Sequence, residues 1–135
     1  MENVKIGQSV LRNEDFRFLT GQGTYIDDIR VDGLTHAAFL RSPHAHAEIV
    51  SIDISKAETQ PGVVKVMTGA DVEAVSDAFM IVIKQPMPQW SLAVEKVRYV
   101  GEPLAVIVAD DRYRAEDAAE LAVVEVEDLP PALSA

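Results

Sequence analysis

One run of residues constrains the fold of this chain more than any other. Residues 104–109 are apolar at every position, and a strand that is apolar on both faces is typical of the centre of a covered sheet. Asp110 and Asp111 follow and can cap a helix over residues 112–122, whose alanines form one small-residue stripe. Residues 123–126 favour a final strand. A strand, a helix and a strand of this length are compatible with a crossover, so we expect a parallel strand pair here.

The rest of the chain favours short strands. Some segments alternate between two kinds of side chain, as strands with two different faces do, and others are short apolar runs. The strands that these patterns predict lie at residues 25–29, 34–41, 48–54, 63–67 and 96–100.

Two short helices are expected between these strands. Ser55 and Glu58 have the spacing of a capping box at the start of a helix. Thr68 and Asp71 predict a second helix, which runs through residue 74. Residues 76–92 keep no pattern and are expected to form a mobile loop. Together, the elements predict an α+β fold with a mixed sheet and a few short helices.

The chain is expected to contain one domain and an arm. A length of 135 residues is enough for one hydrophobic core and too short for two. The first 24 residues are polar and weakly periodic, with Phe16 and Phe18 as isolated apolar anchors. We therefore expect residues 1–24 to form an extended N-terminal arm that lies on another surface, and residues 25–135 to form a single domain.

Charge and composition exclude several classes of function. The chain has 22 acidic residues against 12 basic ones, a net charge of -10, which argues against binding to nucleic acids or anionic membranes. It contains no cysteine, which excludes disulfides, thiolate zinc sites and iron–sulfur clusters held by this chain. The N-terminal residues lack the pattern of a signal peptide, and the longest apolar run is too short to span a membrane. We therefore expect a cytoplasmic location.

His44 and His46 are the residues most suggestive of a metal site. Two positions apart, they share a face of an extended chain, but His36 or a carboxylate would have to complete a zinc ligand set. The run from His46 to Glu48 resembles part of a zinc deaminase motif, which also requires paired cysteines. A structural or interfacial role is therefore favoured for both histidines, and a metal site is the alternative.

For the paired glycines and the paired aspartates, structural interpretations are favoured over a dinucleotide-binding or an acid–base site. Gly21 and Gly23 are half of a dinucleotide-binding fingerprint, but no strand precedes them, so a tight turn with positive φ is favoured. Asp27 and Asp28 are adjacent, and adjacent residues on a strand point to opposite faces, which disfavours an acid–base pair.

The segment around Ser42 offers no triad. Ser42 stands beside Pro43 and His44 without the turn that a nucleophilic serine requires. Arg41 is expected at the end of a strand, where a solvated tip is the favoured interpretation. The alternative is a contact with a carboxylate or phosphate at an interface, which its planar guanidinium suits.

Five stretches of the sequence carry a resemblance to a known family. They are RFLTGQGTYIDD at residues 17–28, LRSPHAHA at 40–47, QPGV at 60–63, VGEPLA at 100–105 and VADD at 108–111. Taken together, they resemble the first large-subunit domain of the xanthine dehydrogenase, aldehyde oxidase and carbon monoxide dehydrogenase family, in the same order and over nearly the whole chain. The chain departs from the family pattern at Glu48, where arginine is usual, and at Val126, where tyrosine is usual. The anion at Glu48 puts in doubt any family contact that relied on the cation.

The resemblance implies an α/β hammerhead domain, the non-catalytic N-terminal structural module of a molybdenum hydroxylase large subunit. Such enzymes use a molybdenum-pterin, iron–sulfur clusters and often FAD. The resemblance implies that other parts of the enzyme hold these cofactors, that this chain binds none of them, and that no catalytic residue carries over. The implied partners are the molybdopterin-binding domain or subunit and the iron–sulfur subunit. A free-standing adapter or binding protein with the same fold is the alternative, and the isolated chain is a candidate homodimer.

The family motifs supply the candidate interface residues. An arm without periodicity gains little by folding on its own domain, so residues 1–24 and 41–46 are expected to be parts of one docking surface for the missing component. Gly101 is expected where another backbone segment comes close. The candidates are Arg17, Phe18, Gly21, Gly23, Asp27, Asp28, Arg41, Ser42, Pro43, His44, His46, Gly101 and Glu102.

Overall fold

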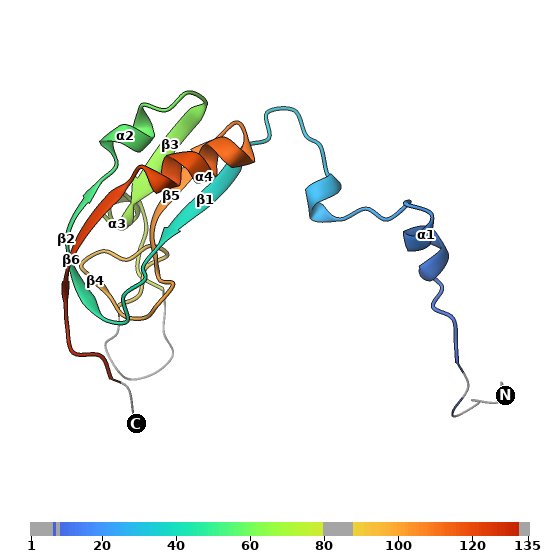
Figure 1. Cartoon of the computed structure of the whole chain (residues 1–135), viewed down its shortest axis with the longest axis horizontal. Helices are drawn as coiled ribbons and strands as arrows, with labels where there is room; N and C mark the ends of the chain where they lie inside the picture. Colours follow the sequence, from blue (N-terminus) through green and yellow to red (C-terminus); the bar gives the residue numbers. More distant parts are fainter. Residues whose placement is uncertain (1–6, 8, 80–87, 133–135) are drawn as a thin grey trace. The chain divides into compact units, whose positions relative to one another are not determined.

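The computed structural model describes residues 7, 9–79 and 88–132 and divides the chain into two units, Met1–Asp32 and Gly33–Ala135 (Figure 1). The predicted arm, residues 1–24, lies within the first unit. Residues 80–87 of the predicted loop at 76–92 lie outside the described residues. Within the described ranges, no helix is long and apolar enough to cross a membrane.

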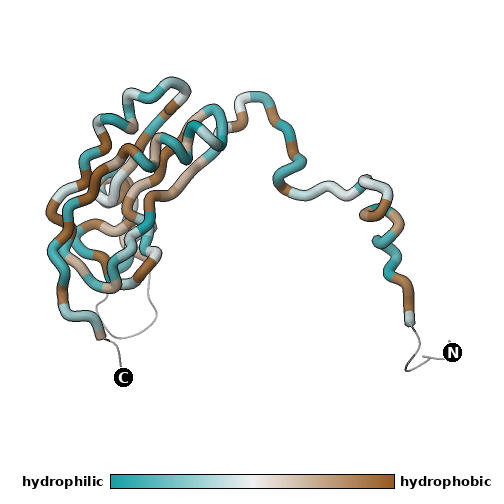
Figure 2. Tube along the Cα trace, viewed as in Figure 1, coloured by the Kyte–Doolittle hydropathy of each residue, from teal (hydrophilic) through white to brown (hydrophobic). Residues whose placement is uncertain are grey.

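The first unit contains two short helical turns and no strand among its described residues. Helix α1 (Asp15–Leu19) was not predicted, and a 3₁₀ turn (Ile26–Asp28) replaces the strand expected at residues 25–29. That prediction is wrong because the Asp28 carboxylate accepts the Tyr25 N–H at 2.9 Å, which closes a turn. Neither turn buries a residue, and hydrophobic stretches alternate with hydrophilic ones along the unit (Figure 2).

The described part of the second unit contains two three-stranded sheets. One has the order β1 (His36–Arg41), β5 (Pro103–Ala109), β3 (Val63–Thr68). The other has the order β4 (Lys96–Val97), β2 (Ala47–Asp53), β6 (Val123–Asp128). The apolar run is thus the central strand of its sheet, as predicted.

The expected parallel pair between the last two strands is wrong. All ladders in the described residues are antiparallel, and β5 and β6 belong to different sheets. Helix α4 (Arg112–Glu120) therefore carries the chain from one sheet to the other. There β6 pairs along β2, with Ile52 opposite Val124. This pairing depends on a strand far away in the sequence, which no local pattern indicates.

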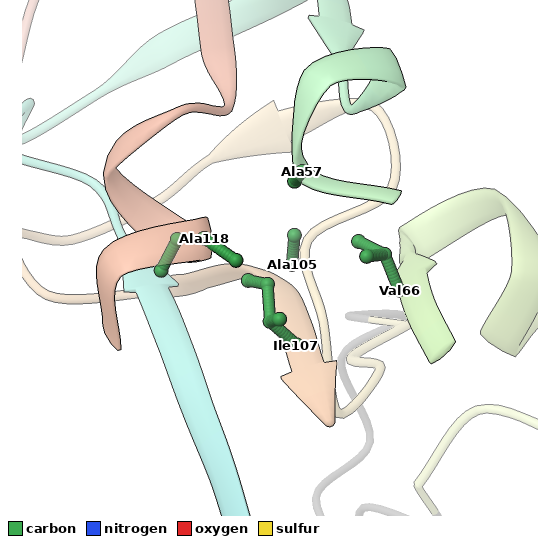
Figure 3. Close-up of a cluster of buried hydrophobic side chains, with 6 residues drawn as sticks. Ala57, Val66, Ala105, Ile107 and Ala118 are labelled. Carbon is green, nitrogen blue, oxygen red and sulfur yellow. The ribbon is translucent and has the colours of Figure 1, made fainter. Parts of the chain in front are cut away.

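The main core lies between α4, α2 (Ser55–Glu58) and one face of the β1-β5-β3 sheet. The alanine stripe of α4 is buried as predicted, and Ala118 packs with Ala57 of α2 and Ile107 of β5 (Figure 3). Small side chains let the helices approach the sheet closely. A second cluster, Ala47, Ala93, Val97 and Leu104, joins the two sheets, and Leu40 packs against both clusters.

Two of the three helix caps predicted from the sequence are present in the structure. Asp111 caps α4 by accepting the Tyr113 N–H at 2.9 Å. Thr68 and Asp71 cap α3 (Gly69–Val75), because the Asp71 carboxylate accepts the Thr68 N–H at 2.8 Å. Ser55 makes no such cap; instead the Asp53 carboxylate accepts the Ser55 N–H at 2.9 Å. The α+β fold, with sheets and a few short helices, agrees with the prediction.

Candidate functional site

The segment from Arg41 to His46 meets two stretches that are distant in sequence, residues 98–102 and 128–130. Ser42 anchors it: the residue is 3% exposed, its N–H donates to the Glu102 carbonyl at 3.0 Å, and its carbonyl accepts the Gly101 N–H at 2.8 Å. The Ser42 hydroxyl accepts the His44 N–H at 3.0 Å. These bonds give Ser42 a structural role, and it lies in no nucleophile turn.

Glu102 is the other buried polar residue in the described part of the second unit, at 3% exposure. Its carboxylate accepts the backbone N–H of Arg98 and lies 3.8 Å from the Arg98 guanidinium. This carboxylate closes the turn from β4 to β5 and shortens the strand predicted at residues 96–100 to Lys96–Val97. In the sequence, an acidic residue between Gly101 and Pro103, directly before an apolar strand, was the signal for a buried carboxylate. No feature of the sequence indicated Arg98 as its partner.

Gly101 occupies this turn with a φ of +88°. A Cβ added there meets no atom within 4 Å. The prediction of a close backbone approach at Gly101 is therefore wrong, and the left-handed backbone conformation is the reason for the glycine. The close approach occurs instead at Gly69, where an added Cβ would lie 2.0 Å from the Ala93 carbonyl oxygen.

The two histidines hold the end of β6. His44 Nδ1 lies 2.7 Å from the Asp128 carboxylate, and His46 Nδ1 lies 3.0 Å from the Pro130 carbonyl oxygen. The Leu129 N–H also donates to the His46 carbonyl at 2.9 Å. Within the ranges that the structure describes, no three His, Cys, Asp or Glu residues are grouped as a metal would need. In this structure both histidines thus link the segment at 44–46 to residues 128–130.

Arg41 is exposed but not free. Its guanidinium donates to the Gly101 carbonyl at 2.9 Å and lies over the Phe39 ring, 5.4 Å from the centroid. Pro43 lines a hollow of about 230 Å³ with Leu40, Leu104 and the strand β6. A second hollow, of about 380 Å³, is lined by His46, Arg98 and Tyr99 among others. No carboxylate, serine or cysteine lines either of these two hollows.

The candidates of the first unit form a local structure of their own. Phe18 stacks on Tyr25 with ring centroids 5.9 Å apart, and the Arg17 guanidinium lies 5.1 Å from the Phe18 centroid. Gly21 has the positive φ predicted for it, +71°. Gly23 does not; it leaves room for Phe18, whose ring an added Cβ would meet at 3.0 Å. The Arg30 guanidinium donates a hydrogen bond to the Asp27 carbonyl at 3.0 Å.

Comparison with known proteins identifies the domain. The family model described as aldehyde oxidase and xanthine dehydrogenase, a/b hammerhead domain, matches residues 20–130. The nicotine 6-hydroxylase large subunit of Paenarthrobacter nicotinovorans is 47% identical over 128 residues, which cover 92% of this chain and 16% of that protein.

Two solved structures share the fold and much of the sequence. Quinoline 2-oxidoreductase from Pseudomonas putida 86 superposes with a TM-score of 0.81 at 50% identity, over 92% of this chain and 16% of that one. The Cu,Mo-CO dehydrogenase superposes with a TM-score of 0.76 at 41% identity, with the same coverage of 92% and 16%. This chain thus spans about a sixth of the length of these relatives. It belongs to the aldehyde oxidase and xanthine dehydrogenase family, as the a/b hammerhead domain.

Proposed function

We propose that this chain is the non-catalytic structural module of a molybdenum hydroxylase-type large subunit. The proposal rests on one observation, which is how the residues of the family motifs are hydrogen-bonded in the second unit. Hydrogen bonds inside the domain are formed by polar groups of Ser42, His44, His46 and Glu102. These bonds hold the shape of the segment, which is what a structural module requires of its residues.

The cofactors belong to other parts of such an enzyme. The chain has no cysteine for an iron–sulfur cluster, and its described residues group no metal ligands. No chemical step is therefore assigned to this chain. Molybdenum-pterin, iron–sulfur clusters and FAD would be supplied by a molybdopterin-binding domain or subunit and an iron–sulfur subunit, in the cytoplasm.

The relatives support this division of labour. In each of them a domain like this one makes up about 16% of a much longer chain. One is named as a hydroxylase subunit and one as a copper- and molybdenum-containing dehydrogenase. The arm and the segment at 41–46 remain proposed docking elements. Since His44 is bonded to Asp128 inside the domain, its contribution to docking would lie in the shape of the segment.

A domain exchange tests the proposal. Residues 20–130 of this chain replace the matching region of the nicotine 6-hydroxylase large subunit, and the chimera is produced with the partner subunits of that enzyme. We expect molybdenum content and nicotine hydroxylation within a few-fold of the parent. A parent with the matching region deleted should lose both.

Two outcomes would contradict the proposal. A chimera without molybdenum would show that this domain does not support the enzyme, as the adapter alternative requires. A deletion variant with full activity would show that the module is dispensable.

A further inference from the structure

The β1-β5-β3 sheet has one face under helices and a second face of unusual composition. The ladder register aligns Phe39, Val106 and Met67 across the three strands, and Ala37, Val108 and Lys65 in the next row. Arg41, which stacks on Phe39, belongs to the same side. We call this surface the Phe39 face; its members are Ala37, Phe39, Arg41, Lys65, Met67, Val106 and Val108.

The Phe39 face is only partly covered by the described residues of the second unit. Phe39 is 48% exposed, and Val106 and Val108 are incompletely buried, although they lie on the central strand. On the opposite face of the same strand, Ala105 and Ile107 are fully buried under α2 and α4. The two faces of β5 are therefore equally apolar in sequence but differ in burial.

This composition does not suit a face that stays in water. An antiparallel sheet with one solvated face normally alternates apolar and polar side chains. Five of the seven residues of the Phe39 face are apolar, and the two polar ones, Arg41 and Lys65, are both basic. An aromatic and a methionine side chain beside an arginine are typical of protein interfaces, where the aspartates and glutamates common in this chain are depleted.

We infer that the Phe39 face docks the cofactor-carrying remainder of a molybdenum hydroxylase large subunit; this inference rests on the proposed function. The relatives keep this domain in one chain about six times its length, so the domain has a large permanent neighbour there. Permanent interfaces are the apolar ones. The bases at Arg41 and Lys65 call for an apolar partner surface with acidic groups at its edge.

Arg41 is prepared for such a contact. Its bond to the Gly101 carbonyl and its position over Phe39 fix the guanidinium beside the apolar rows. A side chain that is already held loses less conformational freedom when a carboxylate binds its remaining donors.

The first experiment introduces a charge into the Phe39 face of the chimera described above. Phe39→Glu is compared with Val50→Glu, which changes a valine that is 57% exposed on β2 of the other sheet. We expect Phe39→Glu to reduce the yield of molybdenum-containing chimera at least about tenfold. Val50→Glu should leave it within about twofold. In the isolated chain, both variants should melt within a few degrees of the parent, because both sites are exposed.

The second experiment identifies the occupant directly. A photo-crosslinking benzoylphenylalanine at position 39 of the chimera should join peptides of the nicotine 6-hydroxylase part. Crosslinks to the N-terminal segment of the chimera that precedes residue 33, or to a second copy of this domain, would overturn the inference.

The two proposals fail differently. A chimera that assembles and tolerates Phe39→Glu contradicts the docking face and leaves the structural-module function intact. An unmodified chimera that does not assemble contradicts the proposed function and, with it, the docking face.

Discussion

The Nδ1 atom of His44 lies 2.7 Å from the Oδ1 atom of Asp128, although 84 positions separate the two residues in the chain. His46 repeats the arrangement two residues later, with Nδ1 3.0 Å from the Pro130 carbonyl oxygen, again 84 positions away. One extended segment thus fastens the end of β6 at two successive points. The two histidines that suggested a metal in the sequence thus contact the end of β6 through their Nδ1 atoms.

The His44–Asp128 contact should contribute little to stability. The side chains are 36% and 75% exposed, and exposed ion pairs contribute roughly 0.2–1 kcal/mol because water screens them. We expect a double-mutant cycle of His44→Ala and Asp128→Ala, measured by urea denaturation, to give a coupling energy in this range. A coupling above about 2 kcal/mol would show a buried pair instead.

Gly69→Ala should be among the most destabilising single substitutions in the chain. An added Cβ would lie 2.0 Å from the Ala93 carbonyl oxygen and 2.9 Å from Val94 Cα, both backbone atoms that cannot rotate away. Overpacking of this kind costs about 3 kcal/mol or more. Denaturation of the purified variants checks this, with Ala70→Ser, at an exposed neighbouring position, expected within about 0.5 kcal/mol of the parent. Equal stability of both variants would disprove the close approach.

Gly101→Val should destabilise the chain by about 1–3 kcal/mol, because a β-branched residue must adopt the φ of +88°. The space around Gly101 is open, so the cost is one of backbone strain and not of collision. Gly101→Asn should therefore cost clearly less, since asparagine tolerates this conformation. If the two variants melt at the same temperature, side-chain size decides and the explanation by φ fails.

These positions show what the sequence could and could not predict. The strand β5, its following helix and the Asp111 cap depend on neighbours within a few residues, so local pattern was enough. The partner of β6 lies on β2, and Gly69 is explained only by Ala93. Both depend on segments that meet only after folding. The prediction at Gly101 named a special glycine correctly but assigned it the wrong physical reason.

Acid should weaken the start of α3. The pKa of Asp71 is lowered from its ordinary 3.8, mainly because the Thr68 N–H donates to the carboxylate, and further by the Thr68 hydroxyl. The unfolded chain then binds the proton more readily than the folded chain. The stabilisation is complete above the unfolded pKa, near 4, and is lost as pH falls through the lower folded pKa.

Asp71→Asn is the control for this effect, because its amide oxygen can accept the same bonds without titrating. We expect the parent to lose more unfolding free energy than Asp71→Asn between about pH 5 and the acid limit. Asp53, whose pKa is lowered chiefly by the Ser55 side chain, contributes equally to both proteins and cancels. Parallel pH profiles for the two proteins would contradict the assignment.

The isolated chain should carry no molybdenum, iron or flavin. It has no cysteine, and its described residues offer no grouped metal ligands. After dialysis, elemental analysis should give far less than one metal per chain, and the absorption spectrum should lack a flavin band. Stoichiometric molybdenum would refute the assignment of the cofactor to other components.

The site was less predictable than the fold. Resemblance to the family marked Arg41 to His46 as part of a docking surface, and this stays a prediction. In the structure Arg41 donates to the Gly101 carbonyl, and the Nδ1 atoms of His44 and His46 lie beside Asp128 and Pro130 of the same chain. The Phe39 face escaped notice because outward and inward positions of β5 are alike in sequence, and only the structure shows which side the helices cover.

The strand order has a consequence for the chain as it leaves the ribosome. The first sheet needs β5, and the second needs β6, whose last residue is Asp128. Neither sheet can close until most of these 135 residues have been synthesised. Its contact order is therefore high, and we expect folding in milliseconds to seconds. During that wait β1, β2 and β3 expose unpaired edges, which makes the nascent domain a natural client for chaperones.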